Sequence, residues 1–229
     1  MTSTSYNTID GRKGQKFIEI TLTIQYNNRL HGNCALFAQF HYLRKILLWI
    51  QDHFRWEGMN WFWKGITSLG NGGWFWIVLC ILMVVFAKIS GEKCSIKNEN
   101  CSRAVIGRAG WYGLLSMGAG ALITNVCLKN LVARPRPYEV VEGLVPLIGK
   151  PTDYSFPSGH TCASFACALV LYRILPKKYG VPAVILASLI AFSRLYVGVH
   201  YPTDVLGGMF VGIFSSCLVL WIGKKRTKK

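Results

Sequence analysis

The fold is decided by residues 181–222, which read VPAVILASLIAFSRLYVGVHYPTDVLGGMFVGIFSSCLVLWI. Two apolar runs, residues 181–199 and 203–222, are separated by a short turn at His200. Each run has close to the roughly 20 residues that a helix needs to cross the hydrocarbon core of a bilayer. This stretch therefore predicts two membrane-spanning helices joined by a tight turn.

Three further apolar runs precede this pair, at residues 74–90, 111–131 and 158–175. Of the 229 residues, 52% are hydrophobic and only 16% are charged, whereas about 25% of the residues in soluble domains are charged. The last four runs follow one another so closely that they indicate one bundle and not separate domains. We predict an all-α fold class, an integral membrane helical bundle of five transmembrane helices.

The segment before the first clear span has a different pattern. Between residues 43 and 69, apolar residues recur at helical spacing with charges between them, and tryptophans stand at positions 49, 56, 61 and 63. This pattern is typical of an amphipathic helix lying in the membrane interface. A sixth span over residues 34–54 is the alternative. We assign residues 1–42 to a polar N-terminal extension and residues 43–229 to the membrane-embedded domain.

The formal net charge is +16, from 26 basic and 10 acidic residues. The basic residues lie mostly between and beyond the apolar runs, so membrane orientation explains them better than nucleic-acid binding. The connections at residues 91–110 and 172–180 and the C-terminal tail are strongly basic, whereas residues 132–157 carry mixed charge. The strongly basic connections and the tail are therefore expected on the cytoplasmic side of the membrane. Five spans then leave the N-terminus outside, and six leave it inside.

Cysteine chemistry is not predicted to be central. Most of the eight cysteines lie in apolar runs and form no metal-type cluster, and no carboxylate cluster suits Mg²⁺. We therefore predict no metal and no cofactor. Cys94 and Cys101 share a hydrophilic loop, and whether they form a disulfide stays open.

Polar residues gather at the ends of the predicted spans in three clusters. The clusters are Lys129 to Pro137, Phe156 to His160, and Ser193-Arg194 with His200 and Asp204. Counting the spans places all three on the side of the membrane that holds residues 132–157. Ionisable residues at span ends often only snorkel to the interface. Cations, two histidines and a carboxylate from three segments at one level indicate a functional site instead.

These residue types suit a phosphate. Lys129, Arg136 and Arg194 supply three cations, enough to neutralise a dianionic phosphate and its transition-state charge. Ser158 and Gly159 follow a proline at the start of a predicted helix, where backbone N–H groups and the helix dipole favour an anion. Ser158 is also a natural N-cap. We expect Arg134 to be a secondary contact to a lipid headgroup.

Two histidines can divide a phosphoryl transfer between nucleophile and general acid. Asp204 stands four residues after His200, so we expect it to orient the His200 ring, with His200 as nucleophile and His160 as acid. If the last helix includes His200, the two residues share a helix face. If the helix begins at Pro202, the turn must bring them together.

The three clusters together resemble the type 2 phosphatidic acid phosphatase superfamily. The shared pattern is Lys-x6-Arg-Pro (Lys129 to Pro137), Pro-Ser-Gly-His (Pro157–His160) and Ser-Arg-x5-His-x3-Asp (Ser193 to Asp204). No motif position is missing, and the match covers about the last two-thirds of the chain. The resemblance implies that His200 is phosphorylated, that Asp204 orients it and that His160 protonates the leaving group. It also implies that Lys129, Arg136, Ser158, Gly159 and Arg194 bind the phosphoryl oxygens without a metal.

The resemblance implies a metal-independent hydrolase of lipid phosphates or diphosphates. Undecaprenyl diphosphate, and with it cell wall biogenesis, is the first expectation, and phosphatidylglycerophosphate and phosphatidic acid are the alternatives. We expect a bacterial cytoplasmic membrane location with an extracytoplasmic active site. Two alternatives come from other functional classes: a peroxidase that holds vanadate in the same anion site, and a non-catalytic lipid-phosphate binder or transporter.

Overall fold

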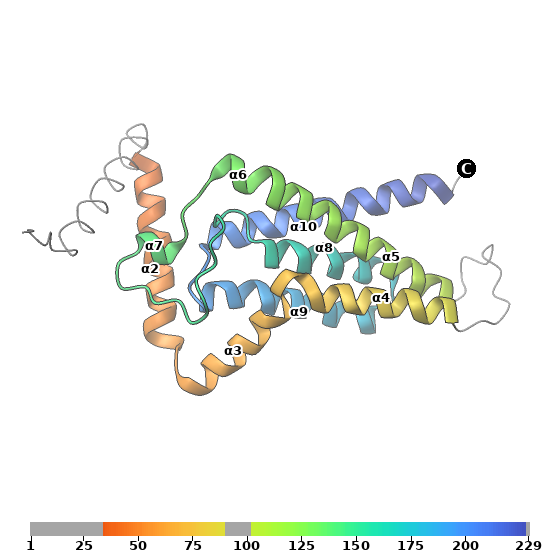
Figure 1. Cartoon of the computed structure of the whole chain (residues 1–229), viewed down its shortest axis with the longest axis horizontal. Coiled ribbons are helices and arrows are strands. Elements are labelled where there is room, and N and C mark those ends of the chain that lie inside the picture. Colours follow the sequence, from red (N-terminus) through yellow and green to blue (C-terminus); the bar gives the residue numbers. More distant parts are fainter. Residues whose placement is uncertain (1–33, 90–101, 228–229) are drawn as a thin grey trace, which may run out of the picture. The chain divides into compact units, whose positions relative to one another are not determined.

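The computed structural model describes residues 34–89 and 102–227, and within them every regular element is a helix (Figure 1). The chain divides into two compact units, Met1–Leu43 and Arg44–Lys229. Of the first unit, the structure describes only the start of the first helix. Most of the predicted extension 1–42 therefore lies outside the described residues, as do Cys94 and Cys101. The all-α fold class is confirmed for the part of the chain that is described.

The elements follow one another along the chain without strands in the described ranges. They are α2 (Cys34–Phe54), α3 (Glu57–Leu69), the 3₁₀ turn η1 (Asn71–Gly73), α4 (Trp74–Ile89), α5 (Ser102–Ala121), the π-helical segment η2 (Leu122–Leu128), α6 (Lys129–Val132), α7 (Pro137–Val140), α8 (Gly159–Ile174), α9 (Lys177–Tyr196) and α10 (Pro202–Thr227). The amphipathic pattern of residues 43–69 thus falls on two helices, α2 and α3, which are separated at Arg55 and Trp56.

Within residues 34–89 and 102–227, four helical segments are long and apolar enough to cross a membrane. They are Asn71–Ile89, Arg103–Val140, Lys177–Tyr196 and Pro202–Lys225, and they coincide with four of the five predicted spans. The fifth prediction corresponds to α8, which has 16 residues, or about 24 Å at 1.5 Å per residue. α8 ends before Pro176, because a residue that precedes proline disfavours the helical conformation; Leu175 is accordingly extended.

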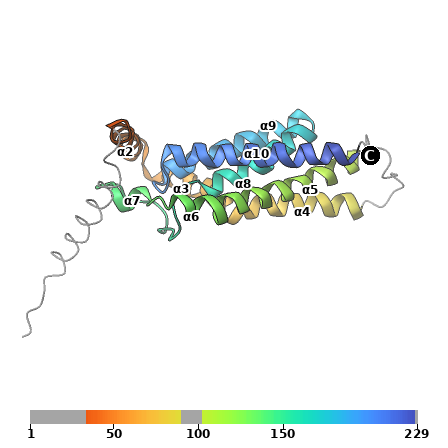
Figure 2. The same cartoon turned by 90° about the horizontal axis from the view of Figure 1, so that it is seen from above.

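Helix α8 is the centre of the bundle in Arg44–Lys229 and packs against α5, α9 and α10 (Figures 1 and 2). Small residues let helix backbones approach closely inside a membrane. A Cβ added at Gly208 of α10 would lie 2.4 Å from the Ser158 carbonyl oxygen, and one added at Gly212 would lie 2.7 Å from that of Cys162. The two glycines therefore let α10 lie directly against α8.

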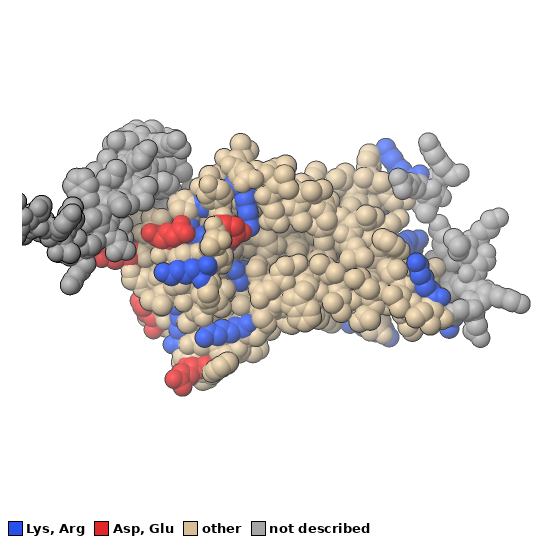
Figure 3. Space-filling model, in the orientation of Figure 1, with Lys and Arg blue, Asp and Glu red and all other residues tan. Residues whose placement is uncertain are grey.

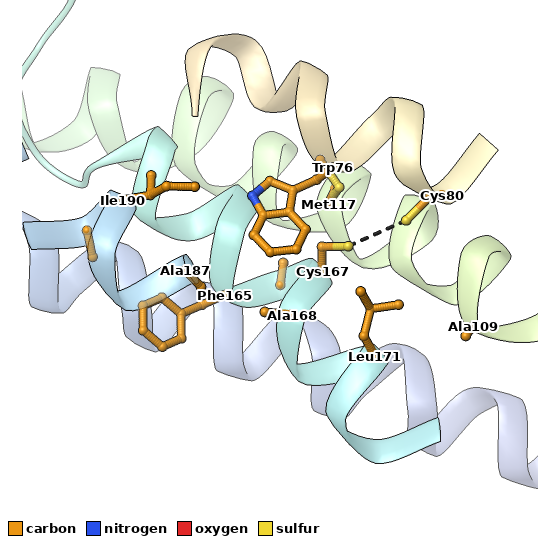
Figure 4. Close-up of a cluster of buried hydrophobic side chains, with 12 residues drawn as sticks. Trp76, Cys80, Ala109, Met117, Phe165, Cys167, Ala168, Leu171, Ala187 and Ile190 are labelled. Atoms are coloured by element: carbon orange, nitrogen blue, oxygen red, sulfur yellow. Dashed lines mark hydrogen bonds between the residues drawn. The ribbon is translucent and has the colours of Figure 1, made fainter. Parts of the chain in front are cut away.

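Figure 4 shows the apolar core between these helices. The indole of Trp76, from α4, is buried against α8, and its Nε1 donates a hydrogen bond to Ser164 Oγ at 3.0 Å. The thiols of Cys80 and Cys167 are 3.4 Å apart. Trp76, Cys80 and Cys167 thus find polar partners inside the protein, as an environment without water favours.

The outer surface of the bundle is apolar. Large side chains such as Leu82, Phe210 and Phe214 are each more than half exposed. On the face drawn in Figure 3, lysine and arginine side chains lie towards both ends of the bundle, acidic side chains lie towards the left end only, and the band between the ends carries neither. An apolar band between charged ends is the surface that a lipid bilayer selects.

Candidate active site

The three predicted clusters meet at one end of the bundle, the end that holds α6 and α7 (Figures 1 and 2). They lie on α6 and the segment after it (Lys129, Arg134, Arg136), on the first turn of α8 (Ser158, Gly159, His160), and on the α9–α10 junction (Arg194, His200, Asp204). The chain direction explains this meeting, because α8 and α10 begin at this end and α9 finishes there.

His200 lies in the turn between α9 and α10 and is almost completely buried. Helix α10 begins at Pro202, so the turn, and not a shared helix face, brings the ring to Asp204. His200 Nδ1 is 3.5 Å from Asp204 Oδ2, and it makes no shorter hydrogen bond within the described residues. On the other side of the ring, Nε2 is 3.3 Å from Arg136 Nη1.

This geometry places one ring nitrogen of His200, Nε2, on the side of the cations. A carboxylate beside Nδ1 favours the tautomer that carries its proton there, so the lone pair of Nε2 is directed towards Arg136. Burial lowers the pKa of the His200 imidazole to about 4. The ring is therefore uncharged at neutral pH, the form in which an imidazole can act as a nucleophile.

Asp204 is buried and accepts hydrogen bonds from several elements at once. Its Oδ2 accepts from the Tyr201 backbone N–H at 2.9 Å and from the Ser155 hydroxyl at 2.5 Å, and its Oδ1 accepts from Arg134 Nη1 at 2.7 Å. Arg134, expected outside the site as a headgroup contact, thus directs its guanidinium to Asp204 instead. The carboxylate is therefore held in place by Arg134, by Ser155 and by the backbone of the turn at Tyr201.

Arg136 and Lys129 form the cationic side of the site. Arg136 is buried; its Nη1 donates to the Val199 carbonyl at 2.9 Å, and its Nη2 contacts Asp153 Oδ1 at 2.6 Å. Lys129 Nζ contacts the other oxygen of the same carboxylate. Both predicted cations therefore share one acidic partner, Asp153, whose side chain is 48% exposed.

The start of α8 has the predicted helix cap. The Ser158 side chain accepts from the backbone N–H of Thr161, and Ser158 N donates to the Asp204 carbonyl at 3.0 Å. A Cβ added at Gly159 would lie 4.0 Å from Lys129 Nζ, so the helix start and this cation are neighbours. The start of α8 therefore lies next to a cation of the site, and a helix start is a position that favours an anion.

His160 and Arg194 are held from a segment that the motifs do not include. His160 Nε2 is 2.9 Å from Asn71 Oδ1, and the buried Arg194 donates from Nη1 to Thr67 Oγ1 at 2.6 Å. Arg194 Nε makes no hydrogen bond within the described residues. The α3–η1 segment therefore positions the predicted acid and the third predicted cation.

Sequence reasoning missed several residues that contact the motif side chains. They are Thr67, Asn71, Asp153 and Ser155. The one sequence signal was weak: Asp153 and Ser155 lie close before the Pro157–His160 cluster, on the same predicted side of the membrane. Thr67 and Asn71 carried no signal, because 127 and 89 residues separate them from their partners.

The protein is thus a helical membrane bundle. One end of the bundle holds a buried histidine–carboxylate pair next to a group of cations, an arrangement that suits an anionic ligand. The model of one protein family, the PAP2 superfamily, matches residues 109–228, slightly more than half of the chain. The chain belongs to the PAP2 superfamily, in agreement with the resemblance of its three motifs.

Similar proteins carry related names. An undecaprenyl-diphosphatase of Sulfolobus acidocaldarius is 38% identical over 102 residues, 44% of this chain and 50% of the relative. Undecaprenyl-diphosphatase BcrC of Bacillus subtilis is 40% identical over 97 residues, 42% of this chain and 49% of the relative. The chain thus spans about half the length of the curated relatives that it matches.

One solved structure is similar over most of both chains. It is a transmembrane PAP2-type phosphatidylglycerolphosphate phosphatase from Bacillus subtilis, with a TM-score of 0.60 and 26% sequence identity. The similarity covers 90% of this chain and 96% of that one. It therefore extends beyond the residues that the family model matches.

Proposed function

We propose that the chain is a membrane lipid phosphatase that hydrolyses a lipid phosphate or diphosphate through a phosphohistidine at His200. One observation carries this proposal. A buried, uncharged His200 has one ring nitrogen beside Asp204 and the other beside Arg136. A nucleophile next to a phosphate-binding cation is the arrangement that phosphoryl transfer needs.

The proposed reaction has two steps. In the first, His200 Nε2 attacks phosphorus, the bond from phosphorus to the lipid-side oxygen breaks, and His160 donates its proton to that oxygen. In the second, water attacks the phosphohistidine and gives a proton to His160, and the phosphorus–nitrogen bond breaks. Inorganic phosphate leaves, and His200 and His160 return to their starting forms. No step needs a metal.

The remaining site residues bind phosphoryl oxygens in this proposal. Lys129, Arg136 and Arg194 supply the cations, and Ser158 and the Gly159 backbone supply neutral donors at the start of α8. Arg194 Nε, buried without a hydrogen-bond partner in the described residues, is a donor that a phosphate oxygen would satisfy.

Undecaprenyl diphosphate is the substrate we place first, because two similar proteins are named undecaprenyl-diphosphatase. Phosphatidylglycerophosphate is the alternative supported by the similar solved structure, and phosphatidic acid is the third. A pocket lined in part by Lys129, Asp153 and Tyr154 reaches the cationic side of the site. We propose that residues 138–154 shape the approach of the lipid there.

For the membrane arrangement we propose five spans, with the short α8 as the central one. Helix α3 would lie in the interface, since Trp61 and Phe62 are exposed. Residues 43–229 would form the phosphatase domain and residues 1–42 an extension. The end opposite the site carries Arg103, Arg108, Arg173, Lys177, Lys178, Lys224 and Lys225. The positive-inside rule then puts the site on the extracytoplasmic face of a bacterial cytoplasmic membrane.

The test is phosphate release by the purified protein in detergent, with EDTA, from undecaprenyl diphosphate, phosphatidylglycerophosphate and phosphatidic acid. We expect turnover of at least one lipid, loss of turnover in His200→Ala and normal turnover in His53→Ala, whose histidine is exposed on α2. Binding without turnover would favour a non-catalytic lipid-phosphate binder. Turnover by His200→Ala at the wild-type rate would exclude the phosphohistidine.

A further inference from the structure

Arg134 is a part-buried cation beside Asp204, although the three motifs do not include it. Its Nη1 donates to Asp204 Oδ1 and to Thr203 Oγ1, each at 2.7 Å. Its guanidinium carbon lies 4.0 Å from the centre of the buried Tyr201 ring. These contacts fix the guanidinium on the first turn of α10, with the side chain only 15% exposed.

The backbone around Arg134 completes this arrangement. Its carbonyl accepts a hydrogen bond from Ser155 N at 2.9 Å, and the Ser155 hydroxyl donates to Asp204 Oδ2 at 2.5 Å. One oxygen of Asp204 therefore faces Arg134, and the other faces Ser155 and His200. The contact is buried and charge-assisted, which makes it one of the stronger kinds of hydrogen bond.

We propose that Arg134, assisted by Ser155, is a positioning residue that holds Asp204 against His200 and balances its charge, so that His200 keeps the neutral form that attacks phosphorus. This inference rests on the proposed phosphatase function. It assigns Arg134 no contact with the substrate, because Arg134 Nη1 donates to Asp204 and Thr203.

The groups that face His200 explain why the charge of Arg134 matters. Arg194 from α9 and Arg136 from the segment after α6 oppose a proton on the ring, whereas Asp204 of α10 favours one. The titratable group on α8 that interacts with His200 is His160. Arg134 offsets the Asp204 carboxylate without facing the ring itself. Replacing it by a neutral residue leaves the carboxylate uncompensated, so the imidazole takes up a proton at a higher pH.

The direction of the effect on activity follows. The nucleophile must be unprotonated, so kcat/KM falls as the pH drops through the pKa of His200 in the free enzyme. Loss of the Arg134 charge, which is in direct contact with the Asp204 carboxylate, is expected to raise the pH midpoint of this acid limb by about one pH unit. Well below both midpoints, the variant would be about tenfold slower than the wild type for this reason alone.

The experiment compares pH profiles of kcat/KM for phosphate release by the full chain in detergent, from about pH 3 to about pH 8. The variants are Arg134→Gln, which removes the charge, and Arg134→Lys, which keeps it. Lys150→Gln is the matched control, since it removes one exposed positive charge at the same end of the bundle. We expect a raised acid limb in Arg134→Gln, a smaller shift in Arg134→Lys and none in Lys150→Gln.

The outcomes separate the two proposals. An acid limb that Arg134→Gln leaves unmoved, or a higher KM with an unchanged profile, would overturn the positioning role and indicate a substrate contact. Should Arg134→Gln not fold, Ser155→Ala carries the test, with a smaller shift in the same direction expected and an unmoved limb overturning the proposal. A wild-type protein that releases no phosphate would instead refute the phosphatase function itself.

Discussion

Asp153 holds the two cations that a substrate phosphate would use. Its carboxylate contacts Lys129 Nζ and, at 2.6 Å, Arg136 Nη2. Burial alone would raise the pKa of the Asp153 carboxyl, but hydrogen bonds from Lys129 and Arg136 hold it at about 2. Asp153 is therefore negatively charged at neutral pH. A phosphate that binds these cations must displace it.

The expected size of this competition follows from the exposure of the carboxylate. The Asp153 side chain is 48% exposed, so each of its two ion pairs is screened by solvent and contributes about 0.5 kcal/mol. In Asp153→Asn, both ionic contacts are lost, and the cost of displacement falls by about 1 kcal/mol. Since about 1.4 kcal/mol corresponds to a factor of ten, we expect KM to fall about fivefold.

The assay is steady-state phosphate release at neutral pH, together with the inhibition constant of inorganic phosphate, which should fall by the same factor. Glu142→Gln is the matched control, because it removes a negative charge from an exposed position of the same connection and should leave both constants unchanged. A higher KM in Asp153→Asn would refute the reasoning. It would mean that Asp153 arranges the cations for the substrate instead of competing with it.

Three further predictions follow from the packing and burial of the site. In Gly212→Ala, the new Cβ would lie 2.7 Å from the Cys162 carbonyl oxygen, so the free energy of unfolding in detergent should fall by about 1–3 kcal/mol. Gly65→Ala is the control, because the space around Gly65 is open, and its free energy of unfolding should not fall. Thr67→Val leaves Arg194 Nη1 without its buried acceptor and should cost about 1–3 kcal/mol in kcat/KM, whereas the exposed Ser68→Ala should not. Burial lowers the pKa of His200 from 6.5 to about 4, so the unfolded chain binds more protons between these values. Thermal stability should therefore decrease as the pH falls from 6.5 to about 4, and less steeply in His200→Gln.

The sequence was sufficient to predict the helical class and four of the spans, because apolar runs of this length with few charges are typical of membrane-spanning helices. It was less informative about α8, whose length depends on two local signals, the Ser158 cap and Pro176. Periodicity between residues 43 and 69 indicated helix, but it did not indicate the break at Arg55 and Trp56 that separates α2 from α3.

For the site, spacing indicated the motif residues but not their partners. His200 and Asp204 were separated by one helical turn in the sequence, yet the contact depends on a turn that ends at Pro202. Thr67 and Asn71 reach the site only because α3 and η1 pack beside α8 and α9. Arg134 and Arg136 are two residues apart and chemically alike, so only the three-dimensional arrangement shows that Arg134 faces Asp204 and Arg136 faces His200.

The most direct test of the account is detection of the covalent intermediate. The protein would be mixed with a lipid substrate that carries a radiolabelled terminal phosphate, quenched in alkali during turnover and mapped by peptide mass spectrometry. The account predicts an alkali-stable, acid-labile phosphoryl group on the peptide that contains His200, and none on that peptide in His200→Gln. Label on a different residue, or turnover without any labelled protein, would contradict it.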